Sequence, residues 1–314
     1  MTTLKTSSHQ QTSTNSSEYQ VHPRLDWLGV LLIILSAAGF ATLGIFGKFA
    51  YAQGFNIASS LFWRVGGAAA MLWLWLILLN QWQIRRRVAT TAFWLGAVGY
   101  TLQAALFFGA LFYTSAGIAA LMFFTYPAFV AIIRWVFLRY PINFWQVLAL
   151  SLAIGGCLWT IDWQQERVHP LGIGLGIASG ACYGLYLVIS ARLVQVTSAI
   201  QTAAYMLLGA TTTTLGFALS QHQLILPQSL AQIGTAAGLA IAATALPIVF
   251  LFIGLRRLDV ISAAILSTLE PILAVVMGVY LLGESLWLGQ IIGGAMVLAS
   301  GLLLQIKQPG SRDQ

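Results

Sequence analysis

The sequence predicts an all-α membrane protein with ten transmembrane helices arranged as two inverted five-helix repeats. Its 314 residues are 59% hydrophobic and only 7% charged, with a mean hydropathy of +0.83, whereas a water-soluble domain needs more charge to cover its surface. Ten apolar stretches approach the length of about 20 residues that crosses a bilayer. Segments 143 to 144 residues apart also resemble each other. These three observations carry the prediction.

The chain begins with residues 1–26, which are rich in Ser, Thr and Gln. Such a segment buries too little apolar surface to fold, so we predict a disordered cytoplasmic tail. It lacks the apolar stretch and cleavage site of a signal peptide, and the first apolar run is expected to stay in the mature protein. A second cytoplasmic tail is predicted at 307–314.

Ten spans follow from the apolar stretches, each placed to within a few residues. They are 27–48, 57–80, 92–113, 115–137, 144–161, 171–190, 199–220, 230–255, 260–282 and 287–306. The two cysteines, Cys157 and Cys182, fall inside apolar runs and predict neither a disulfide nor a metal site.

Basic residues occupy every second loop, and the opposite loops carry only Arg167, beside two acids. By the positive-inside rule both termini are cytoplasmic, in a multi-pass protein of the cell membrane. The arginines are dispersed over loop ends, so the net charge of +7 gives no support to a nucleic-acid partner. The orienting residues after the second, fourth, sixth and eighth spans are Arg85, Arg86, Arg87, Arg139, Arg192, Arg256 and Arg257.

The internal repeat places residues 27–161 over residues 171–306. An odd number of spans in each repeat would give the two repeats opposite orientations, as in many secondary transporters, whose substrate site lies between the repeats near the membrane midplane. A duplication without any consequence for transport is the alternative. The matched residues include Leu28 with Leu171, Ser36 with Ser179, Phe40 with Tyr183, Phe108 with Phe252 and Pro127 with Pro271.

Two segments resemble the drug/metabolite transporter superfamily, and within it the EamA-type permeases. They are LRRLDVISAAILSTLEPILAVVMGVYLLGESLWLGQIIGGAMVLASGLLL (255–304) and its weaker counterpart YTSAGIAALMFFTYPAFVAIIRWVFL (113–138). The second repeat has Gly283-Glu284 where the first repeat has Arg139-Tyr140, a departure in which the first repeat lacks the acid. The resemblance implies a multi-pass permease for amino acids, other metabolites or drugs.

Glu270 and Pro271 lie side by side near the middle of the ninth span. An acid inside the membrane is by default a functional candidate, and a proline interrupts its helix and frees carbonyl groups. Helical spacing puts Glu270 on a stripe of small and polar residues with Ser267, which we expect to face the bundle interior. Tyr126 and Pro127 take the equivalent positions in the first repeat. A structural acid that locks two helices is the alternative.

Arg64 lies about two turns inside the second span. It either extends to the outer surface or faces the interior, where it would bind a substrate carboxylate or pair with Glu270. Lys48 and Arg134 lie nearer the ends of their spans, and for both we predict that the side chain extends to the membrane surface.

The sixth span carries a polar and aromatic stripe of Ser179, Tyr183, Tyr186 and Ser190. With Tyr100 and Gln103 of the third span, Tyr183 and Tyr186 are predicted to line a substrate pathway; helix packing is the alternative for each of them. Gly176, Gly180 and Gly184 form an adjacent edge for close packing.

These features favour a carrier that moves a small metabolite, an amino acid or another amphipathic solute, by alternating access, with export as the expected direction. A small-molecule substrate and the lipid bilayer are the expected partners, and Glu270 would carry a proton where transport is proton-coupled. No cofactor, metal or nucleic acid is predicted, and no oligomeric state is assigned. A channel, a lipid scramblase and an intramembrane enzyme are the alternatives. The enzyme is disfavoured because every histidine lies in the tail or a loop and Glu270 is a lone midplane acid.

Overall fold

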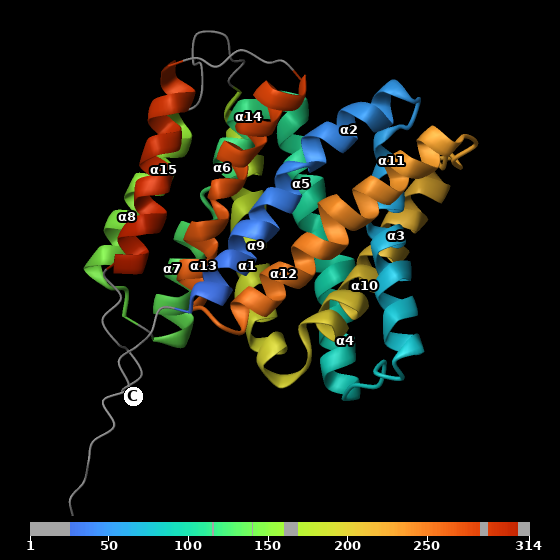
Figure 1. Ribbon diagram of the computed structural model, residues 1–314, viewed down its shortest axis with the longest axis horizontal. Helices are drawn as coiled ribbons and strands as arrows, with labels where there is room; N and C mark the ends of the chain where they lie inside the picture. Colours follow the sequence, from blue (N-terminus) through green and yellow to red (C-terminus); the bar gives the residue numbers. More distant parts are fainter. Residues whose placement is uncertain (1–25, 115, 140, 160–168, 283–287, 307–314) are drawn as a thin grey trace, which may run out of the picture.

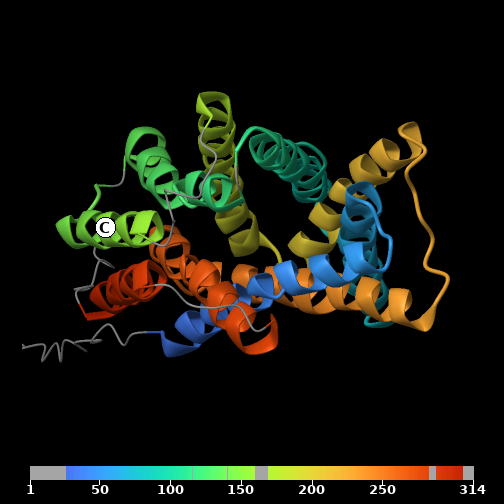
Figure 2. The same ribbon diagram turned by 90° about the horizontal axis from the view of Figure 1, so that it is seen from above.

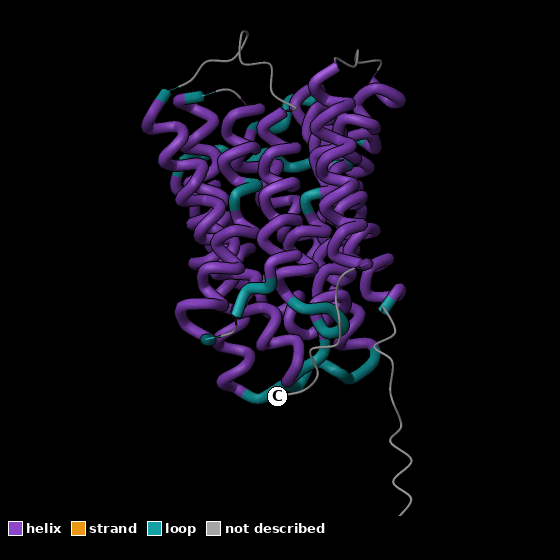
Figure 3. Tube along the Cα trace, turned by 90° about the vertical axis from the view of Figure 1, so that its left-hand side faces the viewer, coloured by secondary structure: helices purple, strands orange, loops and turns teal. Residues whose placement is uncertain are grey.

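A computed structural model of the protein describes residues 26–114, 116–139, 141–159, 169–282 and 288–306. These residues form fifteen α-helices and two short π-helical segments, and no strand occurs among them (Figures 1 and 3). The all-α prediction is confirmed for this part of the chain. The predicted tails lie outside the described residues, apart from Asp26 at the start of the first helix.

The helices divide into a first part, before residue 160, and a second part, after residue 168. The first part holds α1 (Trp27–Ala41), α2 (Leu43–Ala52), α3 (Ile57–Leu78), α4 (Arg86–Trp94), η1 (Leu95–Tyr100), α5 (Thr101–Tyr113), α6 (Ala116–Phe123), α7 (Tyr126–Leu138) and α8 (Phe144–Trp159). The second part holds α9 (Pro170–Val196), α10 (Ala199–Ser220), α11 (Leu230–Ala240), η2 (Ile241–Ala245), α12 (Leu246–Leu255), α13 (Val260–Ser267), α14 (Leu269–Leu282) and α15 (Leu288–Ile306).

Six helical stretches of the described chain are long and apolar enough to cross a membrane, by length and composition. The other predicted spans correspond to shorter apolar helices or to α10, which threonines 211–214 make less apolar. The six stretches are Trp27–Ala52, Ile57–Leu78, Arg86–Ala110, Pro170–Val196, Leu230–Leu255 and Val260–Leu281.

Charged residues gather at one end of the helix bundle. The lower end in Figure 1 holds the start of α1, the start of α4 and the link between α12 and α13, with Arg85, Arg86, Arg87, Arg256 and Arg257. The upper end holds the loops 53–56 and 221–229, neither of which contains Lys or Arg. The loop charges therefore follow the spatial ends of the bundle, as well as the order of the chain.

The two parts of the chain pack into each other. α3 packs along α10, α8 along α15, α5 along α9 and α1 along α12, and every one of these pairs joins the first part to the second. α9 also lies on α6 and α7, just as α1 lies on α13 and α14. The largest helix–helix interfaces are therefore formed between the first part and the second part of the chain.

Several of these contacts occur twice, between residues that the sequence repeat relates. Ser36 donates a hydrogen bond to the Pro247 carbonyl oxygen at 2.7 Å, and Ser179 donates one to the Gln103 carbonyl oxygen at 3.0 Å. Ser36 and Ser179 are 143 residues apart, and Gln103 and Pro247 are 144 apart. Because two related hydroxyls bond two related carbonyls, the weak repeat in the sequence corresponds to a repeated packing arrangement.

The two π-helical segments also follow this repeat. η1 interrupts the stretch from α4 to α5 and η2 the stretch from α11 to α12, with starts 146 residues apart. A π-helical turn holds an extra residue and bends the helix that contains it. Each bent helix thus crosses from one neighbour to another, α4 and η1 lying on α10 while α5 lies on α9.

Candidate functional site

Two pairs of short helices meet end to end inside the bundle, α6 with α7 and α13 with α14. At each junction a threonine hydroxyl donates a hydrogen bond to a carbonyl oxygen three residues earlier, Thr125 to Met122 and Thr268 to Ile265, both at 2.6 Å. Such local bonds compete with the helical pattern. Each interruption precedes its proline, and Pro127 and Pro271 occupy first turns, where a proline is tolerated.

This junction changes the surroundings of Glu270. Helical spacing puts Ser267 and Glu270 on one stripe, but α13 ends at Ser267 and α14 begins at Leu269, so the stripe does not run along one continuous helix. Glu270 is the second residue of α14 and therefore lies at the positive end of that helix's dipole, which favours a carboxylate. The other acids that the structure describes, Asp26 and Asp259, cap helices at the lower end.

Tyr126 links the two junctions. The Tyr126 hydroxyl donates to the Ala264 carbonyl oxygen at 3.1 Å, and its side chain is buried. Because the Thr268 amide bonds Ile265, the Ala264 carbonyl is left without its usual partner inside the helix, and Tyr126 supplies one from α7. The Ser267 hydroxyl bonds the Ala263 carbonyl oxygen at 2.9 Å, within its own helix.

Tyr183 is the centre of an aromatic cluster formed by α6, α7 and α9. Its ring stacks on Tyr186 with centroids 5.4 Å apart and meets the Tyr126 ring edge to face at 4.8 Å. Phe123 contacts both Tyr126 and Tyr183 and extends the cluster to Phe107 of α5. Tyr126 and Tyr186 are buried, whereas Tyr183 is half-buried. Of these three tyrosines, Tyr183 is therefore the one whose side chain stays partly accessible.

Close packing by the glycines of α9 positions this cluster. A Cβ atom at Gly180 would lie 2.8 Å from the Phe123 carbonyl oxygen, and one at Gly176 would lie 2.5 Å from the Met122 side chain. The predicted packing edge of Gly176, Gly180 and Gly184 is confirmed by these distances. The broken helix approaches α9 this closely because these positions carry no side chain.

Arg64 points into the bundle. Its Nε donates to the Thr244 hydroxyl at 2.9 Å, and Thr244, which is fully buried, in turn donates to the Leu239 carbonyl oxygen at 2.8 Å. The guanidinium is close enough to interact electrostatically with the Glu270 carboxylate and with Tyr183. Of the two orientations open to Arg64 in the sequence, the structure therefore has the interior one, facing an acid from the other part of the chain.

Gln103 and Tyr100 approach the cluster from the third predicted span. The Gln103 side-chain amide donates to the Ser179 hydroxyl at 3.1 Å, which ties α5 to α9. Tyr100 ends the π-helical segment η1 and lies within electrostatic range of Tyr183 and Tyr186. Arg64, Glu270 and Tyr100 thus all lie within electrostatic range of Tyr183, and Gln103 is bonded to Ser179 of the same helix.

Sequence reasoning missed Thr244 and Phe123. Thr244 precedes Pro247 by three residues, as Thr268 precedes Pro271, and that shared spacing was a usable signal. Phe123 is one of several phenylalanines in its segment, and no pattern in the sequence distinguishes it from Phe124.

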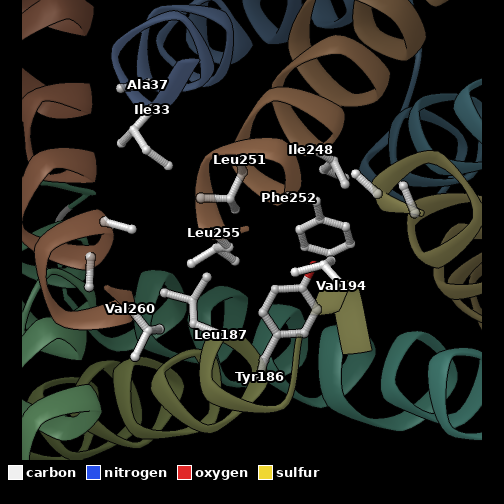
Figure 4. Close-up of a cluster of buried hydrophobic side chains, with 14 of the residues drawn as sticks. Ile33, Ala37, Tyr186, Leu187, Val194, Ile248, Leu251, Phe252, Leu255 and Val260 are labelled. Atoms are coloured by element: carbon white, nitrogen blue, oxygen red, sulfur yellow. The ribbon is translucent and has the colours of Figure 1, made fainter. Parts of the chain in front are cut away.

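Apolar side chains close the bundle below this group. Figure 4 shows Phe252 and Leu255 of α12 facing Tyr186 and Leu187 of α9, with Val260 of α13 beside them. All five are buried, and Phe252 is fully so. We call Tyr186, Leu187, Phe252, Leu255 and Val260 the lower plug.

No equivalent closure exists at the upper end among the described residues. By the repeat, contacts of α12 and α13 with α9 correspond to contacts of α5 and α6 with α1 and α2, yet α1 and α2 have no extensive contact with α5 or α6 in this part of the chain. Figure 2, viewed from above, places the green α6 across from the blue α2. Below the aromatic cluster α9 therefore contacts α12 and α13, whereas the repeat-related helix pairs above it lack extensive contact among the described residues.

Two ion pairs reinforce the lower end. Arg134 of α7 pairs with Asp259 at the start of α13, at the end of the bundle toward which its side chain is predicted to extend. Arg257 pairs with Asp26 at 3.1 Å. The pKa of Asp26 is lowered, first by the hydrogen bond from the Gly29 amide and then by Arg257. Both pairs join the link between α12 and α13 to helices of the first part.

A family model, individual relatives and a solved structure are all similar to this chain. The model of the EamA-like transporter family matches residues 27–161 and again 170–305. The uncharacterized transporter YcbK of Bacillus subtilis is 26% identical over 91% of this chain and 96% of its own. The threonine/homoserine exporter RhtA of Salmonella typhimurium is 28% identical over 88% and 90%. A crystal structure with 15% identity superposes with a TM-score of 0.75 over 88% of this chain, which supports the fold.

Proposed function

The chain belongs to the EamA-like transporter family of membrane transporters, and on that premise we propose that it exports a small amphipathic metabolite such as an amino acid by alternating access. RhtA, one of its relatives, is an exporter of threonine and homoserine, which makes amino acids the first solutes to test.

The proposed topology is ten membrane spans in two inverted repeats, residues 27–161 and 171–306. Its support is the pairing of Ser36–Pro247 with Ser179–Gln103, and the start of α1 and α9 at opposite ends of the bundle (Figure 1). The basic loops at the lower end support a cytoplasmic location for that end and for both termini, in the cell membrane.

One observation carries the transport mechanism: the lower plug closes one end of a packing arrangement whose repeat-related contacts are missing at the other end. In a repeated structure the missing contacts describe a second state, in which α5 and α6 meet α1 and α2 while the lower plug separates. The structure then corresponds to an outward-open state, and exchange between the two states carries the solute across.

Within the proposed site, Arg64 binds an anionic group such as a substrate carboxylate, and Glu270 binds the ammonium group or a coupled proton. The exposed face of Tyr183 packs against the apolar part of the solute, while Tyr100 and Gln103 supply hydrogen bonds. Tyr126, Pro127, Pro271 and Ser267 fix the helix junctions, and Tyr186 belongs to both the site and the lower plug.

Transport by purified protein in liposomes tests the proposal. Uptake and counterflow of labelled threonine, homoserine and larger apolar amino acids are measured between pH 5 and pH 8, for the wild type and for Glu270→Gln and Arg64→Gln. We expect Arg64→Gln to abolish saturable transport and Glu270→Gln to reduce it or to flatten its pH dependence. Asp26→Asn, which neutralises an acid at the lower surface, is the matched control and should transport normally.

Unchanged transport with an unchanged pH profile in Glu270→Gln would remove Glu270 from the mechanism. Fluxes that do not saturate and that far exceed the rate of a conformational cycle would indicate a channel instead. Absence of counterflow for every solute in the panel would refute the amino-acid cargo.

A further inference from the structure

A groove of about 450 Å³ opens sideways between α4 with η1 on one wall and α9 on the other. Its walls include Trp94, Val98, Leu185 and Ile189, and it ends against Tyr186 of the lower plug. Trp94, Val98 and Leu185 are exposed, so the groove opens to the surroundings of the bundle, and it shares only Tyr186 with the proposed site. Its size falls within the roughly 300–1,000 Å³ of small-molecule pockets.

The bend at η1 produces this groove. α4 and η1 pack on α10, whereas α5 packs on α9, so the helix diverges from α9 as it approaches the lower end. A Cβ atom at Gly96 would lie 1.7 Å from the Met206 carbonyl oxygen, which shows how tightly η1 is held on α10. Because η1 is held on α10 while α5 packs on α9, a wedge-shaped space remains between α4 and α9.

The repeat-related wedge, between α11 and α2, is filled by the protein itself. There the ring of Phe46 lies against Gly238, where an added Cβ atom would be only 2.2 Å from the ring. Position 46 corresponds to Ile189 and position 238 to Trp94, by the offsets of 143 and 144. The first wedge has neither the inserted ring nor the glycine that receives it, so it stays open.

The chemistry of the walls favours an apolar chain as the occupant. The hydroxyl protons of Thr90 and Thr91, at the lower end of the groove, are used in hydrogen bonds to the carbonyl oxygens of Arg86 and Arg87 at 2.8–3.0 Å. The rest of the lining is mostly hydrocarbon or aromatic. Little remains to bind a polar solute along the walls.

Two arginines mark where a headgroup would lie. Arg87 precedes Thr91 and Trp94 by four and seven residues, and Arg192 follows Ile189 and Leu185 by three and seven. Residues at these spacings share one face of a helix, so each wall ends in an exposed arginine at the lower end. Basic pockets between transmembrane helices on the cytoplasmic side favour anionic lipid headgroups.

We propose that this groove binds one acyl chain of an anionic phospholipid, with its phosphate between Arg87 and Arg192. The chain end contacts the Tyr186 ring, and the lipid therefore supports the closed form of the lower plug from outside. Binding of this lipid does not depend on the identity of the transported solute.

Photoreactive lipids test the groove directly. The full-length protein is reconstituted into vesicles that contain a trace of phosphatidylglycerol, or of phosphatidylcholine, with a diazirine near the end of one acyl chain. After irradiation, adducts are located by peptide mass spectrometry. We expect phosphatidylglycerol adducts to concentrate in residues 90–99 and 182–189.

Removal of the two arginines provides the quantitative arm. A basic side chain near an anionic membrane surface strengthens binding by a factor of about five, so Arg87→Gln/Arg192→Gln should weaken labelling at the groove about 25-fold. The matched control, Arg139→Gln/Arg256→Gln, removes two exposed arginines from the same end of the bundle and should label like the wild type. Ile189→Trp, which fills the groove while keeping both charges, should also lose the adducts, and its thermal unfolding shows whether it is folded.

Equal labelling by phosphatidylcholine would overturn the headgroup assignment. Adducts spread evenly over the exposed helices, or unaffected by either groove variant in folded protein, would overturn the site. Displacement of the label by a transported amino acid would make the groove part of the transport path and would overturn the lipid assignment.

Discussion

Truncation of Phe252 in the lower plug should release the closed end of the bundle. The Phe252 side chain is fully buried, and its ring lies 6.4 Å from that of Tyr186. A buried Phe→Ala change costs about 3–5 kcal/mol of packing. In the proposed inward-open state the side chains of the lower plug are separated, so removal of the Phe252 ring costs that state less packing free energy. If about half of the cost applies to the closed state alone, the equilibrium shifts by about 2 kcal/mol, or about thirtyfold, toward opening.

Thiol labelling from the cytoplasmic side measures this shift. Val194→Cys places a thiol beside Phe252 and Tyr186 of the lower plug, in a background where Cys157 and Cys182 are replaced by alanine. Inside-out vesicles are treated with a membrane-impermeant maleimide. We expect the labelling rate of Val194→Cys to rise by about thirtyfold when Phe252→Ala is added.

A second truncation separates opening from general loss of stability. Leu72→Ala removes a buried side chain of α3, which packs on α10 away from the plug, and should cost about 2–5 kcal/mol. It should lower the unfolding temperature without faster labelling. The same labelling rate in all three proteins, or an equal rise in both truncated ones, would refute the assignment of Phe252 to a gate.

Three further predictions concern packing, charge pairing and acid stability. Gly180→Val should destabilise the protein by about 1–3 kcal/mol through overpacking, whereas Gly174→Val, whose Cβ has open space, should leave thermal unfolding unchanged. A double-mutant cycle on Arg134→Gln and Asp259→Asn should give a coupling energy between the roughly 1 kcal/mol of an exposed pair and the 3 kcal/mol of a buried one; zero coupling would contradict the pair. The folded-state pKa of Asp26 is lowered from 3.8, so the ionised Asp26 carboxylate stabilises the fold above pH 4. This stabilisation is lost as the pH falls through the folded-state pKa. Asp26→Asn should remove this contribution, which is below about 1 kcal/mol for a partly exposed pair. The difference in the free energy of unfolding between pH 3 and pH 6 should therefore shrink in the variant, and an unchanged difference would contradict the prediction.

Local patterns in the sequence predicted the helices and their approximate bounds. Hydropathy placed α3 and α10 within two residues, because neither helix is interrupted. It ended the sixth span at 190, whereas α9 continues to Val196. Arg192 lies inside that helix with an exposed side chain, and a charge near a membrane surface does not require the helix to stop.

The interruptions were only partly predictable. The prolines indicated breaks in the fourth and ninth spans, but the break at Thr42 has no proline and depends on a hydroxyl bond to the Gly39 carbonyl oxygen at 2.7 Å. The π-helical segments carry no hydropathy signal at all. Their position depends on contacts such as Gly96 against Met206, which join residues more than a hundred positions apart.

The candidate site was also only partly predictable from the sequence. An arginine and an acid inside apolar spans were recognisable from composition, because each is costly there. That Arg64 bonds Thr244, and that Arg134 pairs with Asp259, follows from the way the two parts of the chain interlock. A single sequence holds no local pattern for partners separated by 180 and 125 residues.

The interlocking of the two parts has a consequence for how the protein is made. The main packing partners of α3, α8 and α5 are α10, α15 and α9, so these early helices lack their main partners until the second part of the chain is inserted. Newly inserted N-terminal helices would present glycines, threonines and Arg64 to lipid during synthesis. A chaperone or the insertion machinery should therefore hold them until α15 is complete, and a chain truncated after residue 159 should be degraded rather than accumulate as a stable fragment.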